Sequence, residues 1–205
     1  MLREIYLAGG CFWGLEAYLK RLPGVKKTQV GYANGRTEHP SYQDVCHRHT
    51  GHAETVKVTY QPEVLSLEVL LKAFFRVVDP TSVDRQGWDI GTQYRSGIYY
   101  VEEEELPVIW QAIEAQKKRY AEPIVTEVEP LQNFYPAEEY HQEYLEKNPR
   151  GYCHIHLGEA EEFIQEEGLK DCAKEPEQIS AGAYERPDEQ NLRERLTPLQ
   201  YRVTQ

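Results

Sequence analysis

The order in which predicted strands and helices follow one another constrains the fold of this chain more than any other feature. Four segments have the pattern of strands and two have apolar residues at helical spacing, in the order strand 4–8, helix 11–22, strand 28–35, strand 54–60, helix 65–79 and strand 98–101. This βαββαβ order is the split βαβ arrangement, in which two helices cover one face of an antiparallel sheet. We therefore predict the α+β class, with a ferredoxin-like core, an antiparallel or mixed sheet with helices on one face, and an extended C-terminal tail.

Local signals define the ends of several of these elements. Gly9 and Gly10 permit a sharp turn before the first helix, and Pro23-Gly24 ends it. Ser66 is suited to cap the second helix, which Asp79-Pro80 ends. Further along we predict a helix over 102–120, a strand over 125–131, a helix over 136–147 and, from Gly158, a solvated acidic linker.

Charge and hydropathy exclude several classes of function. The formal net charge is −11, which argues against sequence-independent binding of nucleic acid or anionic lipid. No apolar run approaches the roughly 18 residues of a membrane span, and the N-terminus lacks the pattern of a signal peptide. We expect a cytoplasmic protein whose four cysteines start as thiols, so that any disulfide is transient and catalytic.

The segment IYLAGGCFWG runs from a strand through two glycines to Cys11 at the first turn of a helix. The unpaired N–H groups and partial positive charge of a helix N-terminus favour a reactive thiolate. A small buried core thiol is the alternative. Phe12 and Trp13 would give the site an apolar wall suited to a methyl or thioether group, or pack in the core. Only one of them can face the core squarely, because adjacent helix positions are about 100° apart.

A second group of candidate residues resembles a metal cluster: Cys46, His47, His49 and His52. Tetrahedral sites usually take two ligand pairs from separate elements, whereas these four residues share one short stretch. His154 and His156 are a conceivable distant pair. We predict no metal site, and we interpret Cys46 as a packed, non-essential thiol.

The pentapeptide GCFWG at 10–14 resembles the active-site signature of the type A peptide methionine sulfoxide reductases. Further blocks resemble that family in its order: GYANG at 31–35, TGHAE at 50–54, DIGTQYRSG at 89–97, YHQEYL at 140–145 and NPRGYCHI at 148–155. Together they cover roughly residues 3–157. The resemblance implies a thiol enzyme without metal or organic cofactor that reduces the S epimer of methionine sulfoxide, free or in proteins.

The resemblance also implies roles for individual residues. Cys11 is implied as the nucleophile, which attacks the sulfoxide sulfur and becomes a sulfenic acid. Glu54 matches the family's proton donor, a role that requires a raised carboxyl pKa. Tyr32 and Tyr94 match the tyrosines that hydrogen-bond the sulfoxide oxygen, and Asp89 matches a carboxylate that organises the polar side of the pocket.

Regeneration requires a second thiol. Cys153 matches the family's resolving cysteine, and Gly151 beside it suggests a mobile segment. The resulting disulfide would be reduced by a dithiol partner such as thioredoxin. Cys172 is a possible disulfide relay, although its surroundings match no block of the family.

The end of the chain carries a second resemblance, since LTPLQYRVTQ at 196–205 is similar to the opening of a type B methionine sulfoxide reductase domain. We therefore expect a type A domain over 1–157, an acidic linker over 158–195 and the start of a type B domain over 196–205, as in a fused A–B polypeptide.

Two other functions are compatible with the residues. A thiol peroxidase would also use an activated cysteine and a resolving cysteine, and it would act on hydrogen peroxide without methionine sulfoxide. A non-catalytic metal or redox sensor would use Cys46 and the histidines, and it would contain stoichiometric zinc.

Overall fold

The computed structural model describes residues 1–169. Its strands are β1 (Arg3–Gly9), β2 (Val25–Ala33), β3 (Ala53–Tyr60), β4 (Arg85–Gln86), β5 (Asp89–Ile90), β6 (Ser96–Tyr100), β7 (Glu127–Pro130) and β8 (Phe134–Pro136). Its α-helices are α1 (Phe12–Leu19), α2 (Tyr42–His47), α3 (Leu67–Val77), α4 (Leu106–Lys117), α5 (Tyr144–Lys147) and α6 (Glu159–Glu167). Two 3₁₀ turns are η1 (Thr92–Tyr94) and η2 (Glu103–Glu105). No helix within residues 1–169 is long and apolar enough to cross a membrane.

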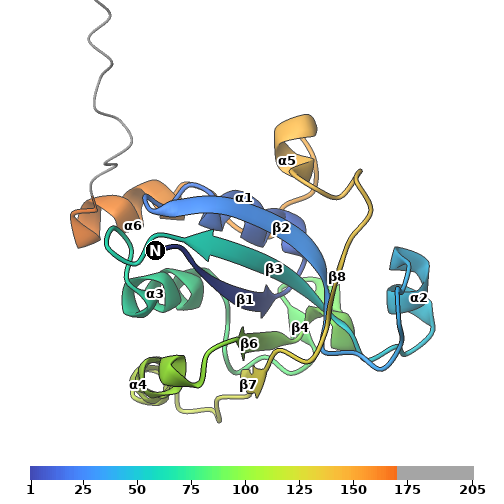
Figure 1. Cartoon of the computed structure of the whole chain (residues 1–205), viewed down its shortest axis with the longest axis horizontal. Coiled ribbons are helices and arrows are strands. Elements are labelled where there is room, and N and C mark those ends of the chain that lie inside the picture. The colour runs from blue at the N-terminus through green and yellow to red at the C-terminus, as the bar shows by residue number, and fades with distance from the viewer. Residues whose placement is uncertain (170–205) are drawn as a thin grey trace, which may run out of the picture. The chain divides into compact units, whose positions relative to one another are not determined.

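Six strands form one curled sheet in the order β7-β6-β1-β3-β2-β8 (Figure 1). Its centre, β6-β1-β3-β2, is antiparallel throughout, and β3 lies between β1 and β2. This is the split βαβ arrangement that the element order predicts, so the α+β prediction is confirmed. The edges extend it, since β7 pairs parallel with β6 and β8 pairs antiparallel with β2.

Alternating side chains give the sheet two different faces. Ile5 and Leu7 of β1 join the main core, while Tyr6 and Ala8 between them join a smaller cluster on the opposite face. The main core also contains buried side chains from α1, α3, α4 and α6. One face of the sheet is therefore covered by helices, as predicted.

Helix α3 follows the expected end signals. The Ser66 hydroxyl accepts a hydrogen bond from the Val69 N–H at 3.3 Å, which satisfies one of the free donors at the helix start. The helix ends at Val77, two residues before Asp79-Pro80. Its apolar side chains are fully buried at Leu70, Leu71, Ala73 and Phe74.

The segment predicted as a helix over 136–147 differs in the structure. Only Tyr144–Lys147 is helical, and Phe134–Pro136 forms the edge strand β8. Gln142 explains the difference, because its side-chain amide accepts from the Val30 N–H and donates to the Val30 carbonyl, both at 2.9 Å. These bonds hold the segment against β2 in place of a regular strand pair. Glu143 then has a φ of 52°, a left-handed conformation that a continuous helix excludes.

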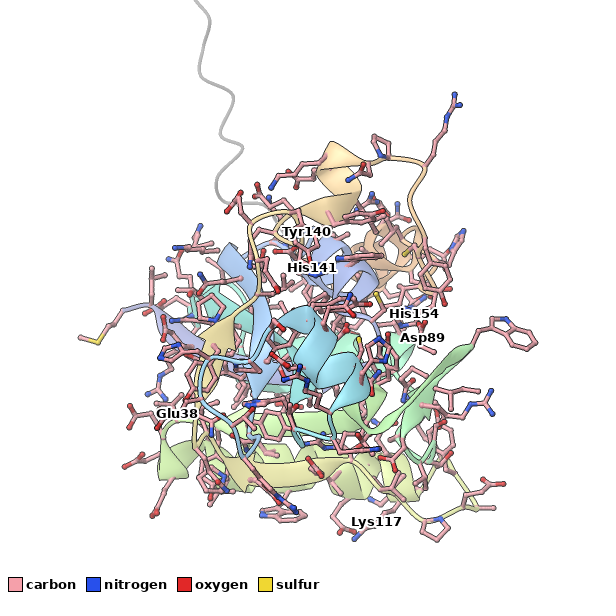
Figure 2. All side chains as sticks on the ribbon, turned by 90° about the vertical axis from the view of Figure 1, so that its right-hand side faces the viewer. Glu38, Asp89, Lys117, Tyr140, His141 and His154 are labelled. Carbon is pink, nitrogen blue, oxygen red and sulfur yellow. The ribbon has the colours of Figure 1, made fainter. Side chains whose placement is uncertain are left out.

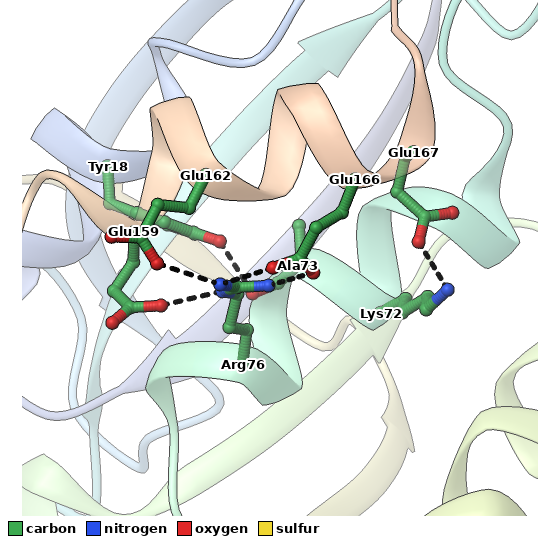
Figure 3. A network of polar contacts seen from close by, with 8 residues as sticks. All are labelled: Tyr18, Lys72, Ala73, Arg76, Glu159, Glu162, Glu166 and Glu167. Carbon is green, nitrogen blue, oxygen red and sulfur yellow. Dashed lines mark hydrogen bonds and ion pairs between the residues drawn. The ribbon is translucent and has the colours of Figure 1, made fainter.

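Helix α6 lies in the segment that we predicted to be an acidic linker. Ala160 and Phe163 are buried in the main core, so this part of the segment is an amphipathic helix. The acidic side chains of α6 face α3, where Arg76 pairs with Glu159, Glu162 and Glu166 (Figure 3). The net charge of the segment conceals this pairing. The remainder of the predicted linker and the predicted start of a type B domain at 196–205 lie outside the described residues.

Replacing Arg76 with alanine is expected to lower the free energy of unfolding by about 1–2 kcal/mol, because exposed ion pairs contribute about 0.2–1 kcal/mol each and Arg76 makes three. Urea unfolding measures this. Arg48→Ala is the matched control: Arg48 makes one pair, with Asp44, and its side chain is 78% exposed. An equal loss of stability in both variants would show that the ion pairs of Arg76 do not stabilise the packing of α6 on α3.

Candidate active site

The turn between β1 and α1 places Cys11 at the start of the helix. Gly10 has a φ of +84°, which favours glycine, and an added Cβ there would lie 2.6 Å from Cβ of Gln86. Cys11 follows as the N-cap residue of α1. The strand, turn and helix therefore bring the thiol to the first turn, where the sequence predicts it.

The thiol of Cys11 is nearly buried, with 7% of the residue exposed. Burial raises its pKa well above the ordinary range, and the Glu54 carboxylate raises it further. The N–H groups of Trp13 and Gly14 lower the pKa by a smaller amount. Burial therefore acts against the thiolate that the helix N-terminus predicts, and it is the larger of the two effects.

Glu54 is hydrogen-bonded to the backbone of Phe12, the residue that follows Cys11. Its Oε2 accepts a hydrogen bond from the N–H of Phe12 at 3.1 Å, and the residue is 1% exposed. Burial raises the pKa of Glu54 to about 8, the hydrogen bond from Phe12 opposes this rise, and the Asp89 carboxylate adds to it. At pH 7 the carboxyl is therefore mostly protonated, which is the state that a proton donor requires.

Two tyrosines lie beside this carboxyl. Tyr32 on β2 is directly opposite Glu54 on β3 in the sheet register, and its hydroxyl donates to Oε2 of Glu138 at 2.9 Å. Tyr94 ends η1, and burial, with smaller effects from Glu54 and Cys11 among others, raises its pKa. Burial also raises the pKa of Tyr32. Both phenols therefore keep their protons, and the proton of Tyr32 is donated to Glu138 in this structure.

Asp89 is the first residue of β5, which pairs with β4 in a short hairpin. Its Oδ2 accepts a hydrogen bond from the Tyr152 hydroxyl at 3.1 Å and lies 3.6 Å from Nδ1 of His154. Figure 2 shows Asp89 and His154 side by side. The hairpin thus connects the site to the C-terminal segment that carries Cys153.

Phe12 and Trp13 differ in burial, as the helix geometry predicts. Phe12 is 1% exposed and packs in the main core, whereas Trp13 is half-buried. The Trp13 indole stacks on Tyr144 with ring centroids 3.7 Å apart, and its N–H donates to Nδ1 of His141 at 3.0 Å. An aromatic surface therefore follows directly after the thiol.

Glu138 and His141 contact the predicted site residues, although neither residue is predicted for the site from its own sequence context. Glu138 accepts from the Tyr32 hydroxyl and from the backbone N–H of Tyr42. His141, labelled in Figure 2, is 1% exposed and accepts from Trp13. His141 lies in the YHQEYL block, so the block match was the available signal; Glu138 precedes that block and gave none.

Cys153 lies against the first turn of α1, the helix that begins directly after Cys11. An added Cβ on Gly14 would lie 3.1 Å from Sγ of Cys153. The Cys153 thiol donates to the Ile155 carbonyl at 3.0 Å. Cys11, Cys46 and Cys153 are free thiols in this structure, and Cys172 lies outside the described residues.

His52, the one buried member of the Cys46–His52 group, is used structurally. Its Nδ1 accepts from the Gly35 N–H at 3.1 Å, and its Nε2 lies 2.9 Å from the Thr37 carbonyl. Within residues 1–169 no three histidine, cysteine or acidic side chains gather in a way that could hold a metal ion.

Sequence comparison gives the family of this chain. A family model described as peptide methionine sulfoxide reductase matches residues 3–172, which extends past the predicted boundary at 157 and includes α6. The peptide methionine sulfoxide reductase MsrA of Alkaliphilus metalliredigens (strain QYMF) is 58% identical over 156 residues, or 76% of this chain and 99% of that protein.

Solved structures agree with the sequence matches. Mxr1 from Saccharomyces cerevisiae in reduced form has a TM-score of 0.70 at 44% identity and covers 74% of this chain and 88% of its own. Mxr1 in complex with Trx2 has a TM-score of 0.50 at 30% identity and covers 70% of this chain and 84% of its own. This chain therefore belongs to the type A peptide methionine sulfoxide reductases, the enzymes that reduce methionine sulfoxide.

Proposed function

We propose that Cys11 is the nucleophile and Glu54 the proton donor of this reduction. The observation that carries the proposal is the protonated, buried carboxyl of Glu54, which is hydrogen-bonded to the first N–H of α1 beside the Cys11 thiol. Cys11 attacks the sulfoxide sulfur while Glu54 protonates the oxygen, and the thiol proton returns to Glu54. The new S–S bond and the S–O bond of the substrate then break as the hydroxyl passes to the Cys11 sulfur, so Cys11 becomes a sulfenic acid and methionine is released.

The surrounding side chains fit the two ends of a sulfoxide. The half-buried Trp13, next to the buried Phe12, offers apolar surface for the methyl and thioether groups. The hydroxyl of Tyr94 acts as a donor to the oxygen, and that of Tyr32 does so when it turns from Glu138. Asp89 stays on the polar side with Tyr152. A pocket with one apolar wall and one donor wall distinguishes the two epimers, and we assign the S epimer, free or in proteins, as the substrate.

A coupled assay on separated epimers of a methionine sulfoxide peptide tests this function, with hydrogen peroxide as a parallel substrate. We expect turnover of the S epimer alone with thioredoxin as reductant. Reduction of the R epimer would contradict the stereochemical assignment. Peroxide turnover without sulfoxide reduction would replace the function with that of a thiol peroxidase.

We propose that Cys153 resolves the sulfenic acid as a disulfide, which thioredoxin then reduces. The short separation between Cys153 and the first turn of α1 supports this, and so does the existence of an Mxr1 complex with Trx2. Cys172 is proposed as a later relay of the disulfide. The cycle needs a reducing compartment such as the cytoplasm, and it uses no metal or organic cofactor.

Cys153→Ser is expected to release one methionine per enzyme and then stop with thioredoxin, because the first step needs only Cys11 and Glu54. Counting methionine in a single turnover and in the coupled assay measures both properties. Cys46→Ser is the control, since Cys46 on α2 takes no part in the proposed cycle. Normal cycling of Cys153→Ser would assign the resolving role to another thiol.

A further inference from the structure

His154 has a buried imidazole that the proposed cycle leaves without a role. Its side chain is 7% exposed, and neither Nδ1 nor Nε2 has a hydrogen-bond partner of normal geometry. Native proteins leave few buried polar side-chain atoms without a partner, so each such atom calls for an explanation. His154 follows directly after Cys153, so the ring and the resolving thiol belong to the same short segment.

Gly10, before Cys11, and Gly14, in the first turn of α1, make room for this ring. An added Cβ on Gly10 would lie 3.0 Å from Nε2 of His154. An added Cβ on Gly14 would lie 3.5 Å from Nδ1 of His154 and 3.1 Å from Sγ of Cys153. The imidazole therefore packs against Gly10 and Gly14, and its Nδ1 and the Cys153 thiol both lie against Gly14. The thiol donates to the Ile155 carbonyl in this structure, so it must turn from that carbonyl to reach the ring.

The protonation states of His154 and Cys153 suit transfer of a proton from the thiol to the imidazole. Burial lowers the pKa of His154, and the Asp89 carboxylate and the Gly9 carbonyl offset this only in part, so the ring is neutral at pH 7. Burial raises the pKa of Cys153, with smaller opposing effects from the Ile155 backbone and Arg21. The resolving thiol is therefore protonated where it lies, and the group beside it is in the form that accepts a proton.

We propose that His154 is the base that activates Cys153 for disulfide formation; this inference rests on the proposed function of Cys11 and Cys153. His154 takes the thiol proton as the sulfur of Cys153 attacks the sulfur of the Cys11 sulfenic acid. An S–S bond forms, the S–O bond of Cys11 breaks, and the hydroxyl leaves as water with the proton that the imidazolium returns. Cys153 is oxidised and Cys11 is reduced, so no external oxidant or net proton is needed.

Asp89 has a positioning role in this step. Its Oδ2 lies 3.6 Å from Nδ1 of His154, and the Tyr152 hydroxyl holds the same oxygen. A carboxylate in this place stabilises the imidazolium that forms during proton transfer. The titratable groups near His154 are thus Asp89, with Tyr152 behind it, and the neighbouring Cys153.

The test separates the two chemical steps in the full chain. His154→Gln is mixed with excess methionine sulfoxide without reductant, and both the methionine released and the thiols remaining are counted over time. We expect methionine release within about twofold of the unaltered protein and disulfide formation slowed by about 10²-fold at pH 7. His156→Gln is the matched control, because His156 is exposed on the same segment, and both rates should be unchanged.

The pH dependence distinguishes a base from a residue that only supports the loop. In the unaltered protein the disulfide step should be flat between about pH 7 and 8, since the imidazole is already neutral. In His154→Gln it should rise about tenfold per pH unit, because the thiolate fraction of Cys153 then sets the rate. A structural role predicts the same loss at every pH, and that result would overturn the inference.

Failure of the inference and failure of the proposed function give different results. Disulfide formation in His154→Gln as fast as in the unaltered protein assigns the proton to another base, such as the Glu54 carboxylate, and overturns the role of His154. Absence of methionine release from the unaltered protein overturns the function of Cys11 itself.

Discussion

Cys11→Ser is expected to release no methionine from methionine sulfoxide with any reductant. A serine hydroxyl has nearly the same size as a thiol, so the buried turn before α1 should fold unchanged. Its oxygen is a far weaker nucleophile toward sulfur and cannot form a sulfenic acid. Acid-quenched single-turnover mixtures measure the methionine, and a sulfenic-acid trapping reagent followed by mass measurement of the chain measures the intermediate.

Cys46→Ser and Cys153→Ser are the controls for this loss. Both should release methionine in the first turnover and give a trapped sulfenic acid, the latter with greater persistence. Methionine release from Cys11→Ser at the rate of either control would remove Cys11 from the chemistry, whatever the family resemblance implies.

Glu54→Gln is expected to slow the first chemical step by about 10²–10⁴-fold, the usual contribution of a general acid. Glutamine keeps the shape of the side chain and still accepts the Phe12 N–H through its amide oxygen, but it cannot give a proton to the sulfoxide oxygen. In the unaltered enzyme, the same step should weaken as pH rises through about 8, where the Glu54 carboxyl ionises. A single-turnover pH series of both proteins measures the two effects, and an equal rate at pH 7 would exclude the role.

Stability provides a control for Glu54→Gln. Below the ordinary pKa of 4.5 the carboxyl is protonated in the folded and unfolded chain alike. Between 4.5 and about 8 only the unfolded chain ionises, so the unaltered protein loses stability relative to the variant as pH rises through this window. Urea unfolding at pH 7 should therefore find the variant at least as stable, which separates a chemical defect from a folding defect.

Much of the fold can be predicted from local sequence patterns. The alternation in 54–60 and the capped helix after Ser66 depend on residues a few positions apart, and the structure has both. The segment over 136–147 was mispredicted because its conformation depends on Gln142 bonding to β2, at 112 positions of separation. Helix α6 was not predicted for the same reason: four of its five glutamates pair with Arg76 and Lys72 of α3, which the composition of the segment does not reveal.

At the site, too, some features follow from neighbouring residues and others depend on residues far apart in the sequence. The turn into Cys11 is visible in ten residues, and its place at the helix start follows from them. The thiolate predicted from the helix N-terminus takes no account of burial under distant side chains, which raises the pKa of Cys11. The protonated state of Glu54 was expected through the family resemblance, and its physical cause, enclosure between β2, β3 and the start of α1, required the structure.

The hydrogen bond from Trp13 to His141 joins residues 128 positions apart, so the site is made from the first and last parts of the domain. During synthesis the ribosome releases Cys11 early, and Glu138, His141 and Cys153 emerge only near the end. Until then, the growing chain carries the Cys11 thiol without Glu138, His141 and Cys153. Contacts of such long sequence separation also form late in folding. We therefore expect the proposed cycle to operate only after the segment that carries Cys153 has joined the fold.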